Sequence, residues 1–365
     1  RSGFYNYKDQ ANAYAAGAYQ RKDSPYHDYF AFSDNRDEAW PNNNSYEKWW
    51  GNDTLPKLNY EGSRDLAEAI LEIGRKWVSA PYNVDGWRLD VAADLGHSAT
   101  YNHMFWKKFR LVVKEANPEA IILAEHYGDP FSWLQGDEWD TIMNYDAFME
   151  PVTWFLTGME KHSDAKNEAM RGDGEMFFNA ILYHMSRMPE NSILCSMNQL
   201  SNHDHSRFMT RTNQTVGRIG TSGSAAADAG VSPALYRLGA MMQMTWPGAP
   251  TLYYGDEAGM QGYKDPFNRA FFPWGRENRE LQNYYIRLGK VRRSTDCLKE
   301  GEFIPVSSVL SCVCFERRGK NDSCLLIANR NEQDITYYLP PRWQNTSEVL
   351  LVPGLSAVIL KKETT

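Results

Sequence analysis

From residue 63 onward, apolar residues recur at the spacing of an amphipathic helix. Four of them follow the pattern i, i+4, i+7, i+11 and therefore share one helix face: Leu66, Ile70, Ile73 and Trp77. Ser63 is a residue type that caps helix N-termini, and Pro81 is expected to end this helix. The apolar run at 84–91 then predicts a buried strand.

The alternation of helix and strand continues to about residue 254. Further helices are predicted at 105–117, 147–158, 175–187 and 233–245. Further strands are predicted at 120–124, 140–145, 193–200 and 250–254. Strands that alternate with helices indicate a parallel α/β sheet with crossover connections. Residues 216–232 are rich in Gly, Ala and Ser and are predicted to form a mobile loop.

The two ends of the chain differ from this middle part. Residues 1–62 have little periodicity and many aromatic, Asn, Asp and Pro residues, which is typical of a long irregular excursion. After residue 298, short β-type runs are separated by turn residues with no helix between them, which predicts a small antiparallel sandwich. We therefore predict three regions, at 1–62, 63–297 and 298–365.

Composition narrows the possible partners. The 365 residues carry a net charge of −7 and contain no block of Lys and Arg, so we expect no nucleic acid and no anionic membrane as a partner. No apolar run approaches the ~20 residues that span a bilayer. The five cysteines show no metal-ligand spacing, and their use favours a reducing compartment such as the cytoplasm. The chain opens on Arg1 rather than Met, so we expect its true start to be missing and leave localisation open.

Three acids follow short, mostly apolar runs: Asp90, Glu125 and Asp204. Catalytic residues of (β/α) barrels lie at the C-terminal ends of several strands, so this placement predicts an active site at one barrel rim. A set of carboxylates at such a rim indicates chemistry on a glycosidic bond.

The neighbours of these acids suggest specific catalytic roles, although each also has a purely structural explanation. Arg88 and Asp90 share one strand face, where a guanidinium keeps a carboxylate ionised for nucleophilic attack; a structural ion pair explains them equally well. Desolvation and a nearby anion favour the protonated form of Glu125, as a proton donor requires, but a capping or salt-bridged Glu is the alternative. His203 and Asp204 suit adjacent sugar hydroxyls, a metal or a loop hydrogen bond.

These segments resemble the α-amylase superfamily of retaining glycoside hydrolases. Three of its signatures are similar to Asp85-Gly-Trp-Arg-Leu-Asp-Val-Ala, Ala124-Glu-His-Tyr-Gly-Asp and Ser201-Asn-His-Asp. Leu55-Pro-Lys-Leu-Asn59 is similar to the segment that marks the neopullulanase, cyclomaltodextrinase and maltogenic amylase branch. Residues 251–259 look like that family's eighth barrel strand and the loop after it.

The resemblance implies a role for each matched residue. Asp90 would be the nucleophile, Glu125 the general acid/base and Asp204 the transition-state stabiliser. Arg88 and His203 would hold the attacked glucose. Further substrate-binding candidates are a lysine in the branch-marking segment and four aromatic residues, each of which could equally be packing: Lys57, Trp49, Trp50, Tyr127 and Trp133. Trp274 is a further aromatic candidate of the same kind.

The resemblance also implies an α/β fold, a TIM (β/α)8 barrel with a domain B excursion and a C-terminal antiparallel β-sandwich. Only about five barrel strands can be counted, whereas closure requires eight. Either the chain holds only about the fourth to eighth strands, or the barrel hypothesis is wrong. The signature ending in Asn-His near the third strand is absent, so we expect an N-terminal segment of the same protein to complete the barrel and this chain alone to be inactive. Ala93-Asp94 stands where the branch usually has Asn-Glu, which leaves the balance of hydrolysis and transfer open.

The function expected from these features is retaining hydrolysis of α-glucosidic bonds in maltooligosaccharides and starch-type polymers. The alternatives are an α-glucan transglycosidase of the same superfamily and a non-catalytic, carbohydrate-binding or scaffold protein. No cofactor is expected to be required. The sequence has no clustered Asp/Asn loop that would support calcium, and it does not specify an oligomeric state.

Overall fold

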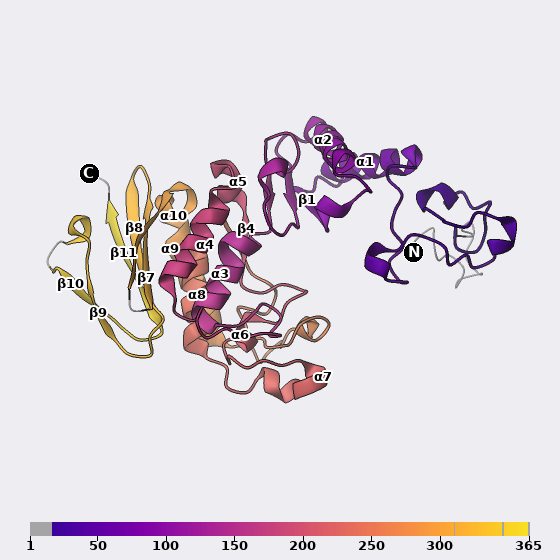
Figure 1. Cartoon of the computed structure of the whole chain (residues 1–365). Coiled ribbons are helices and arrows are strands. Elements are labelled where there is room, and N and C mark those ends of the chain that lie inside the picture. Colours follow the sequence, from indigo (N-terminus) through magenta and orange to yellow (C-terminus); the bar gives the residue numbers. More distant parts are fainter. Residues whose placement is uncertain (1–16, 310, 345–346, 364–365) are drawn as a thin grey trace. The chain divides into compact units, whose positions relative to one another are not determined.

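The computed structural model describes residues 17–309, 311–344 and 347–363. The chain divides into two compact units (Figure 1). The first unit contains Arg1–Glu125 and Gln135–Trp139, and the second contains His126–Leu134 and Asp140–Thr365.

The first part of unit one is irregular, as predicted. Its secondary structure consists of three 3-10 turns, η1 (His27–Tyr29), η2 (Asp37–Ala39) and η3 (Trp49–Gly51), and of isolated antiparallel bridges such as Phe30 with Leu58. The described residues of this part form no regular layers of helices or strands. Its small, largely aromatic core has three buried members: Ala18, Phe30 and Tyr46. Residues 1–16 of the predicted excursion lie outside the described residues.

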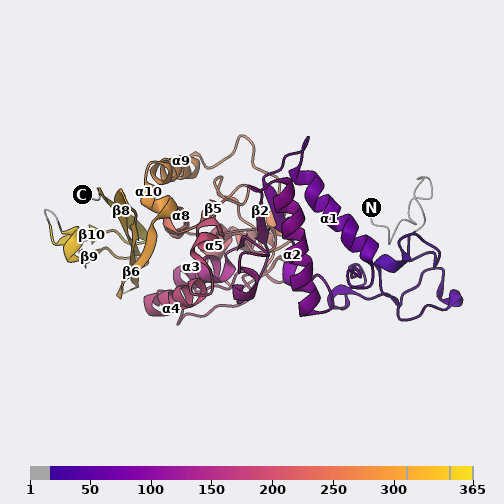
Figure 2. The same ribbon diagram turned by 90° about the horizontal axis from the view of Figure 1, so that it is seen from above.

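Two helices of unit one confirm the predicted pattern. Helix α1 (Arg64–Val78) begins after Ser63, whose hydroxyl accepts a hydrogen bond from the Leu66 amide. Helix α2 (Ala99–Ala116) lies beside it (Figure 2). The helices approach closely because Gly74 has no side chain, and a Cβ there would lie 2.6 Å from the Phe109 ring.

Two parallel strands complete unit one. Strand β1 (Gly86–Leu89) pairs with β2 (Ile121–Ala124), and the register runs from Gly86 opposite Ile121 to Leu89 opposite Ala124. The Trp87 indole donates to the Gly74 carbonyl, which fixes β1 to α1. Because both strands end at the same edge, the residues that follow them, Asp90 and Glu125, emerge side by side.

The second unit continues the alternation of strands and helices. Strand β4 (Met197–Gln199) pairs in parallel with β5 (Ala249–Thr251), and Met143, next to β3 (Thr141–Ile142), forms a parallel bridge with Met197. The longer helices are α3 (Glu150–Thr157), α4 (Gly174–Met185), α8 (Pro233–Thr245) and α9 (Arg279–Arg293). Shorter elements are the π-helical turn η6 (Tyr145–Met149), α5 (Glu190–Cys195), α6 (Phe208–Arg211), α7 (Ile219–Ser222) and α10 (Asp296–Glu300). Four 3-10 turns are η5 (Phe131–Trp133), η7 (Ser224–Ala227), η8 (Phe267–Arg269) and η9 (Pro341–Trp343).

Several local predictions in this unit were inaccurate. The strand predicted at 193–200 is shorter, because α5 continues to Cys195 before the chain extends. Helix α9 was not predicted, although its first turn is capped by Asn278. The predicted loop at 216–232 contains the short helix α7 and the turn η7. In the part of the chain that is described, no helix is both long and apolar enough to cross a bilayer.

The C-terminal strands form an antiparallel sheet, as predicted. Strands β6 (Glu302–Val309), β7 (Cys312–Arg318), β8 (Asp322–Asn329) and β11 (Ser356–Glu363) are ordered β11-β8-β7-β6. A hairpin of β9 (Ile335–Tyr338) and β10 (Val349–Val352) packs over it around a buried apolar core.

Trp246 joins this sheet to the helices of unit two. Its side chain is fully buried and contacts two aromatic rings of the helical layer, Phe148 and Phe177. It also contacts two rings of the sheet, Phe303 and Phe315. The sheet is therefore packed against the helical layer through a continuous aromatic core.

Candidate active site

One guanidinium joins the two acids that end β1 and β2. Arg88 Nη1 donates to Asp90 Oδ1, and Arg88 Nη2 lies 3.0 Å from Glu125 Oε2. The Glu125 side chain is 9% exposed, whereas that of Asp90 is 76% exposed. A shared cation reduces the repulsion between two neighbouring carboxylates. The arrangement thus places one open and one enclosed carboxylate on the same guanidinium.

The backbone after Asp90 contributes a second donor to Glu125. Val91 has a φ of 42°, which is an unusual conformation for a β-branched residue. The resulting sharp turn directs the Val91 amide toward Glu125 Oε2, at 3.3 Å. Glu125 is therefore oriented by both a side chain and a backbone group.

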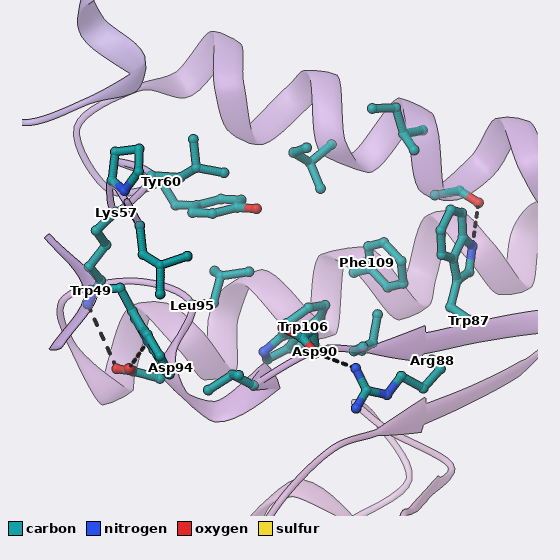
Figure 3. A pocket seen from close by; sticks show the side chains of 18 of the residues that line it. Trp49, Lys57, Tyr60, Trp87, Arg88, Asp90, Asp94, Leu95, Trp106 and Phe109 are labelled. Atoms are coloured by element: carbon teal, nitrogen blue, oxygen red, sulfur yellow. Dashed lines mark hydrogen bonds and ion pairs between the residues drawn. The ribbon is translucent and has the colours of Figure 1, made fainter. Parts of the chain in front are cut away.

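A cavity of about 730 Å³ opens beside Asp90 within unit one (Figure 3). Trp49, Lys57 and Arg88, three of the predicted substrate-binding residues, line it together with Asp90. Asp94 lies on the same wall, where it accepts a 2.8 Å hydrogen bond from Trp49 Nε1 and lies 3.8 Å from Lys57 Nζ.

Several apolar side chains provide much of the cavity wall: Leu55, Ile70, Ile73, Leu89 and Phe109. Trp50 does not line the cavity and is 80% exposed. Its exposed indole is therefore a separate surface of the first unit.

Asp204 and His203 belong to unit two. His203 Nε2 lies 3.3 Å from Asp204 Oδ2, and Arg269 Nη2 lies 3.6 Å from Asp204 Oδ1. The Asn202 side chain accepts a hydrogen bond from the Asp204 amide and fixes the turn. Asp204 therefore has a cationic neighbour, Arg269, which was not singled out in the sequence analysis.

Tyr127 lies on a stacked aromatic pair in unit two. Its ring is parallel to that of Tyr145, with centroids 4.2 Å apart, and Lys161 Nζ lies 4.5 Å from the Tyr127 ring centre. The Tyr127 hydroxyl lies 3.3 Å from His205 Nε2. Tyr127 is 45% exposed, whereas Trp133, another predicted sugar-stacking residue, is 7% exposed. Tyr127 thus offers the larger accessible ring face.

His205 was not singled out from the sequence, although it directly follows Asp204. Burial, with the nearby Arg211 charge, lowers the pKa of His205 to about 2. Its imidazole is consequently neutral at physiological pH. A buried neutral imidazole next to a tyrosine hydroxyl supports the orientation of the Tyr127 ring rather than adding charge to the site.

One group among the described residues has the side chains and spacing of a metal site: Glu160, His162 and Asp164. Glu160 already contacts His162 at 2.7 Å, and Asp164 is paired with Arg218. Because the carboxylates have partners of their own, this group is explained without an ion.

Comparison with protein families identifies the family of this chain. The model of the α-amylase catalytic domain matches residues 4–336. The chain belongs to the α-amylase catalytic-domain family. This assignment agrees with the resemblance found in the four signature segments.

Individual α-amylase relatives cover most of this chain. A cyclomaltodextrinase of Thermoanaerobacter pseudethanolicus is 31% identical over 334 residues, which is 86% of this chain and 52% of the relative. Neopullulanase 2 of Thermoactinomyces vulgaris is 34% identical over 249 residues, which is 68% of this chain and 36% of the relative. Among solved α-amylase-type structures, the native debranching enzyme of Nostoc punctiforme has a TM-score of 0.76 at 26% identity, covering 93% of this chain and 71% of that chain. The chain thus spans about half the length of the cyclomaltodextrinase. It spans a smaller share, 36%, of the length of neopullulanase 2.

Proposed function

We propose that this chain carries the catalytic centre of a retaining α-glucan hydrolase. The observation that carries the proposal is the single guanidinium of Arg88 shared by Asp90 and Glu125 at adjacent strand ends. Retaining glycosidases hold their two carboxyl groups ~5–5.5 Å apart, and carboxylates that contact one guanidinium are compatible with that spacing. Membership of the α-amylase family supports the same chemistry.

In the proposed mechanism the two carboxylates take different roles. Asp90 attacks the anomeric carbon while Glu125 gives its proton to the departing glycosidic oxygen, which forms a covalent glucosyl–Asp90 ester. Glu125, now ionised, removes a proton from water, and that water breaks the ester with retention of configuration. The exposed Asp90 suits attack on a substrate, and the enclosed Glu125 suits proton transfer.

Asp204 and His203 are proposed to hydrogen-bond the hydroxyls of the attacked glucose. Such contacts accelerate the reaction if they strengthen as the ring flattens in the transition state. Arg269 Nη2, 3.6 Å from Asp204 Oδ1, would help to orient the carboxylate for this role. Lys57, Trp49, Trp50, Tyr127 and Trp133 remain the proposed substrate-binding residues, with Tyr127 favoured by its exposed, supported ring.

We also propose that β1–β5 are the fourth to eighth strands of an eight-stranded barrel. The parallel pairing of β1 with β2 and of β4 with β5 supports this assignment. A segment of the same protein would supply the earlier strands. The proposed regions are then a domain B at 1–62, the barrel portion at 63–297 and the sandwich at 298–365. No cofactor is proposed for the reaction.

The substrates are proposed to be α-linked glucose oligosaccharides or polysaccharides, since relatives are named cyclomaltodextrinase and neopullulanase. A transglycosidase is the second candidate, because Asp94 stands where the branch usually has Glu and borders the cavity next to Asp90. Products from maltotriose separate the two: glucose and maltose indicate hydrolysis, and longer oligosaccharides indicate transfer.

The central test is the replacement of each acid in the complete protein. Asp90→Asn should reduce the release of reducing sugar from cyclodextrin, pullulan or soluble starch by at least about 10⁴-fold while substrate binding persists. Glu125→Gln should slow natural glucans far more than a p-nitrophenyl glycoside, because p-nitrophenolate leaves without being protonated. Asp85→Asn, an exposed acid of the same segment, is the matched control and should stay active. Near-normal turnover of Asp90→Asn would refute the assignment.

A further inference from the structure

Arg330, directly after β8, is buried, but its guanidinium forms few contacts with polar groups of the protein. The residue is 8% exposed, and its Nε donates to the Leu156 carbonyl near the end of α3, at 3.0 Å. Its two terminal nitrogens have no hydrogen-bond or ion-pair partner in the described part of the chain. A cationic group at this depth that the protein leaves unpartnered needs water or a ligand as its partner.

The other buried arginines of the described residues behave differently. Arg207 and Arg211 use terminal nitrogens to bind carbonyl or side-chain oxygens, and Arg207 also pairs with Asp256. Arg317 donates from all three of its nitrogens to backbone carbonyls. Arg330 therefore differs from these three arginines, each of which donates from at least one terminal nitrogen to an oxygen of the protein.

The free end of Arg330 lines a polar cavity of about 220 Å³. We call it the Arg330 pocket, and its lining residues are Arg171, Ser311, Arg330, Asn331 and Glu332. A water molecule occupies about 30 Å³ in the liquid, so the pocket has room for a group several times larger. Its walls come from the segment between α3 and α4 and from the ends of β7 and β8 that face it.

The charges around this pocket favour an anion. Burial, and after it the neighbouring Arg171, lower the pKa of Arg330, but a guanidinium keeps its charge at neutral pH. Glu168 and Glu332 are the nearest carboxylates, and Glu168 already pairs with Arg171 at 2.7 Å. Neither carboxylate forms an ion pair with Arg330 within the described residues. Of the two neighbouring guanidinium groups, that of Arg171 is therefore paired with a carboxylate, whereas the terminal nitrogens of Arg330 are left to bind an anion.

We propose that the Arg330 pocket binds a phosphate group, held by the terminal nitrogens of Arg330, the hydroxyl of Ser311 and the positive charge of Arg171. The planar fork of a guanidinium matches two oxygens of a phosphate, which makes Arg the preferred residue for such recognition. The Ser311 hydroxyl has no hydrogen-bond partner in the described part of the chain, and a side chain at Gly172 would close on it. The phosphate can be inorganic phosphate or the ester of a sugar. This site is separate from the proposed catalytic centre and does not depend on it.

The test is calorimetric titration of the complete protein with sodium phosphate and, separately, with glucose 6-phosphate. Sodium chloride at matched ionic strength gives the reference for general charge screening. We expect saturable binding of at least one phosphate compound to the unmodified protein. Arg330→Gln and Arg171→Gln should each weaken it by about tenfold or more, since hydrogen bonds to charged groups are strong.

Two further variants keep the test decisive. Lys320→Gln removes the same charge from the opposite end of the β7–β8 hairpin and should bind like the unmodified protein. If Arg330→Gln fails to fold, Arg171→Gln still serves, because its side chain is 38% exposed and its ion pair with Glu168 is a surface pair. Binding of both compounds, or of glucose 6-phosphate alone, supports the site and identifies its ligand. Binding of neither, or binding that Arg171→Gln leaves intact, overturns the proposal.

Discussion

Arg88 Nη2 lies 3.0 Å from Glu125 Oε2 while the other terminal nitrogen of the same side chain pairs with Asp90. The register of β1 and β2 produces this contact, because the two acids follow residues that are paired across the strands. Arg88 therefore orients both acids at once. Its replacement should affect them together rather than one at a time.

Arg88→Met should reduce kcat by about a hundredfold or more on cyclodextrin or maltotriose. Loss of the guanidinium leaves the enclosed Glu125 without its cation and lets the two carboxylates repel each other. Arg88→Lys should restore only part of the rate, because a single ammonium cannot contact two carboxylates as a fork does. Steady-state kinetics provides the measurement. Arg64→Met on the exposed surface of α1 is the control, and equal rates for both Met variants would contradict the role of Arg88.

Tyr127→Ala should raise the KM for maltotriose by about three- to tenfold, since an aromatic contact contributes about 0.5–1.5 kcal/mol beyond simple burial. Tyr127→Phe should stay close to the unmodified protein, because the ring still stacks on Tyr145 although the contact of the hydroxyl with His205 is lost. Tyr183→Ala removes another exposed tyrosine of unit two and serves as the control. A KM unchanged in Tyr127→Ala would exclude this ring as a sugar platform.

His205 should make the protein less stable in mild acid. The pKa of His205 falls from 6.5 to about 2 on folding. Below pH 6.5 the imidazole therefore binds a proton in the unfolded chain but not in the folded protein. Stability is therefore full above pH 6.5 and decreases as the pH falls toward 2, by at most about 1.4 kcal/mol per pH unit. Urea unfolding of the unmodified protein at pH 7 and pH 5 should show a loss of up to about 2 kcal/mol from this residue.

The matched variants for this pH dependence are His205→Gln and His184→Gln. Glutamine cannot take up the proton, so His205→Gln should show a smaller loss between pH 7 and pH 5. His184 lies in the last turn of α4 and is only partly buried, so His184→Gln should retain the full loss. An identical pH dependence in all three proteins would show that His205 is not the responsible group.

Trp246→Ala should lower the free energy of unfolding by about 3–5 kcal/mol, as is usual when a buried aromatic side chain is removed from a core. The indole is fully buried between rings of two layers, and the cavity left behind would weaken both. Chemical denaturation gives the measurement. Trp274→Ala, at an 81% exposed position, should change the stability very little. Similar losses in both variants would contradict the structural role of Trp246.

Local patterns predicted the parts of the fold that local physics determines. Helix α1 was predicted from the cap at Ser63 and from the apolar stripe that ends at Trp77. Strands β1 and β2 were predicted from the short apolar runs before Asp90 and Glu125. Helix α9 was missed because its buried positions are few among many charged residues. The boundary between α5 and β4 was missed because a short apolar run is ambiguous between helix and strand.

The site could be predicted only as far as neighbouring residues along the chain allowed. Arg88 and Asp90 lie two residues apart on one strand, so their pairing follows from the pleat. The contact of Trp49 with Asp94 spans 45 residues and depends on how an irregular segment folds back, which no periodicity encodes. The unpaired terminal nitrogens of Arg330 could not be predicted from the sequence either, because their lack of a partner among the described residues depends on the three-dimensional fold.

The aromatic cluster around Trp246 has a practical consequence for anyone who shortens this polypeptide. A stop codon before residue 302 would remove Phe303 and Phe315 and uncover the indole together with the neighbouring rings of α4 and η6. An exposed hydrophobic surface of this kind promotes aggregation. Expression trials should therefore keep the final strands and attach tags beyond them, instead of treating the last sixty or so residues as a dispensable tail.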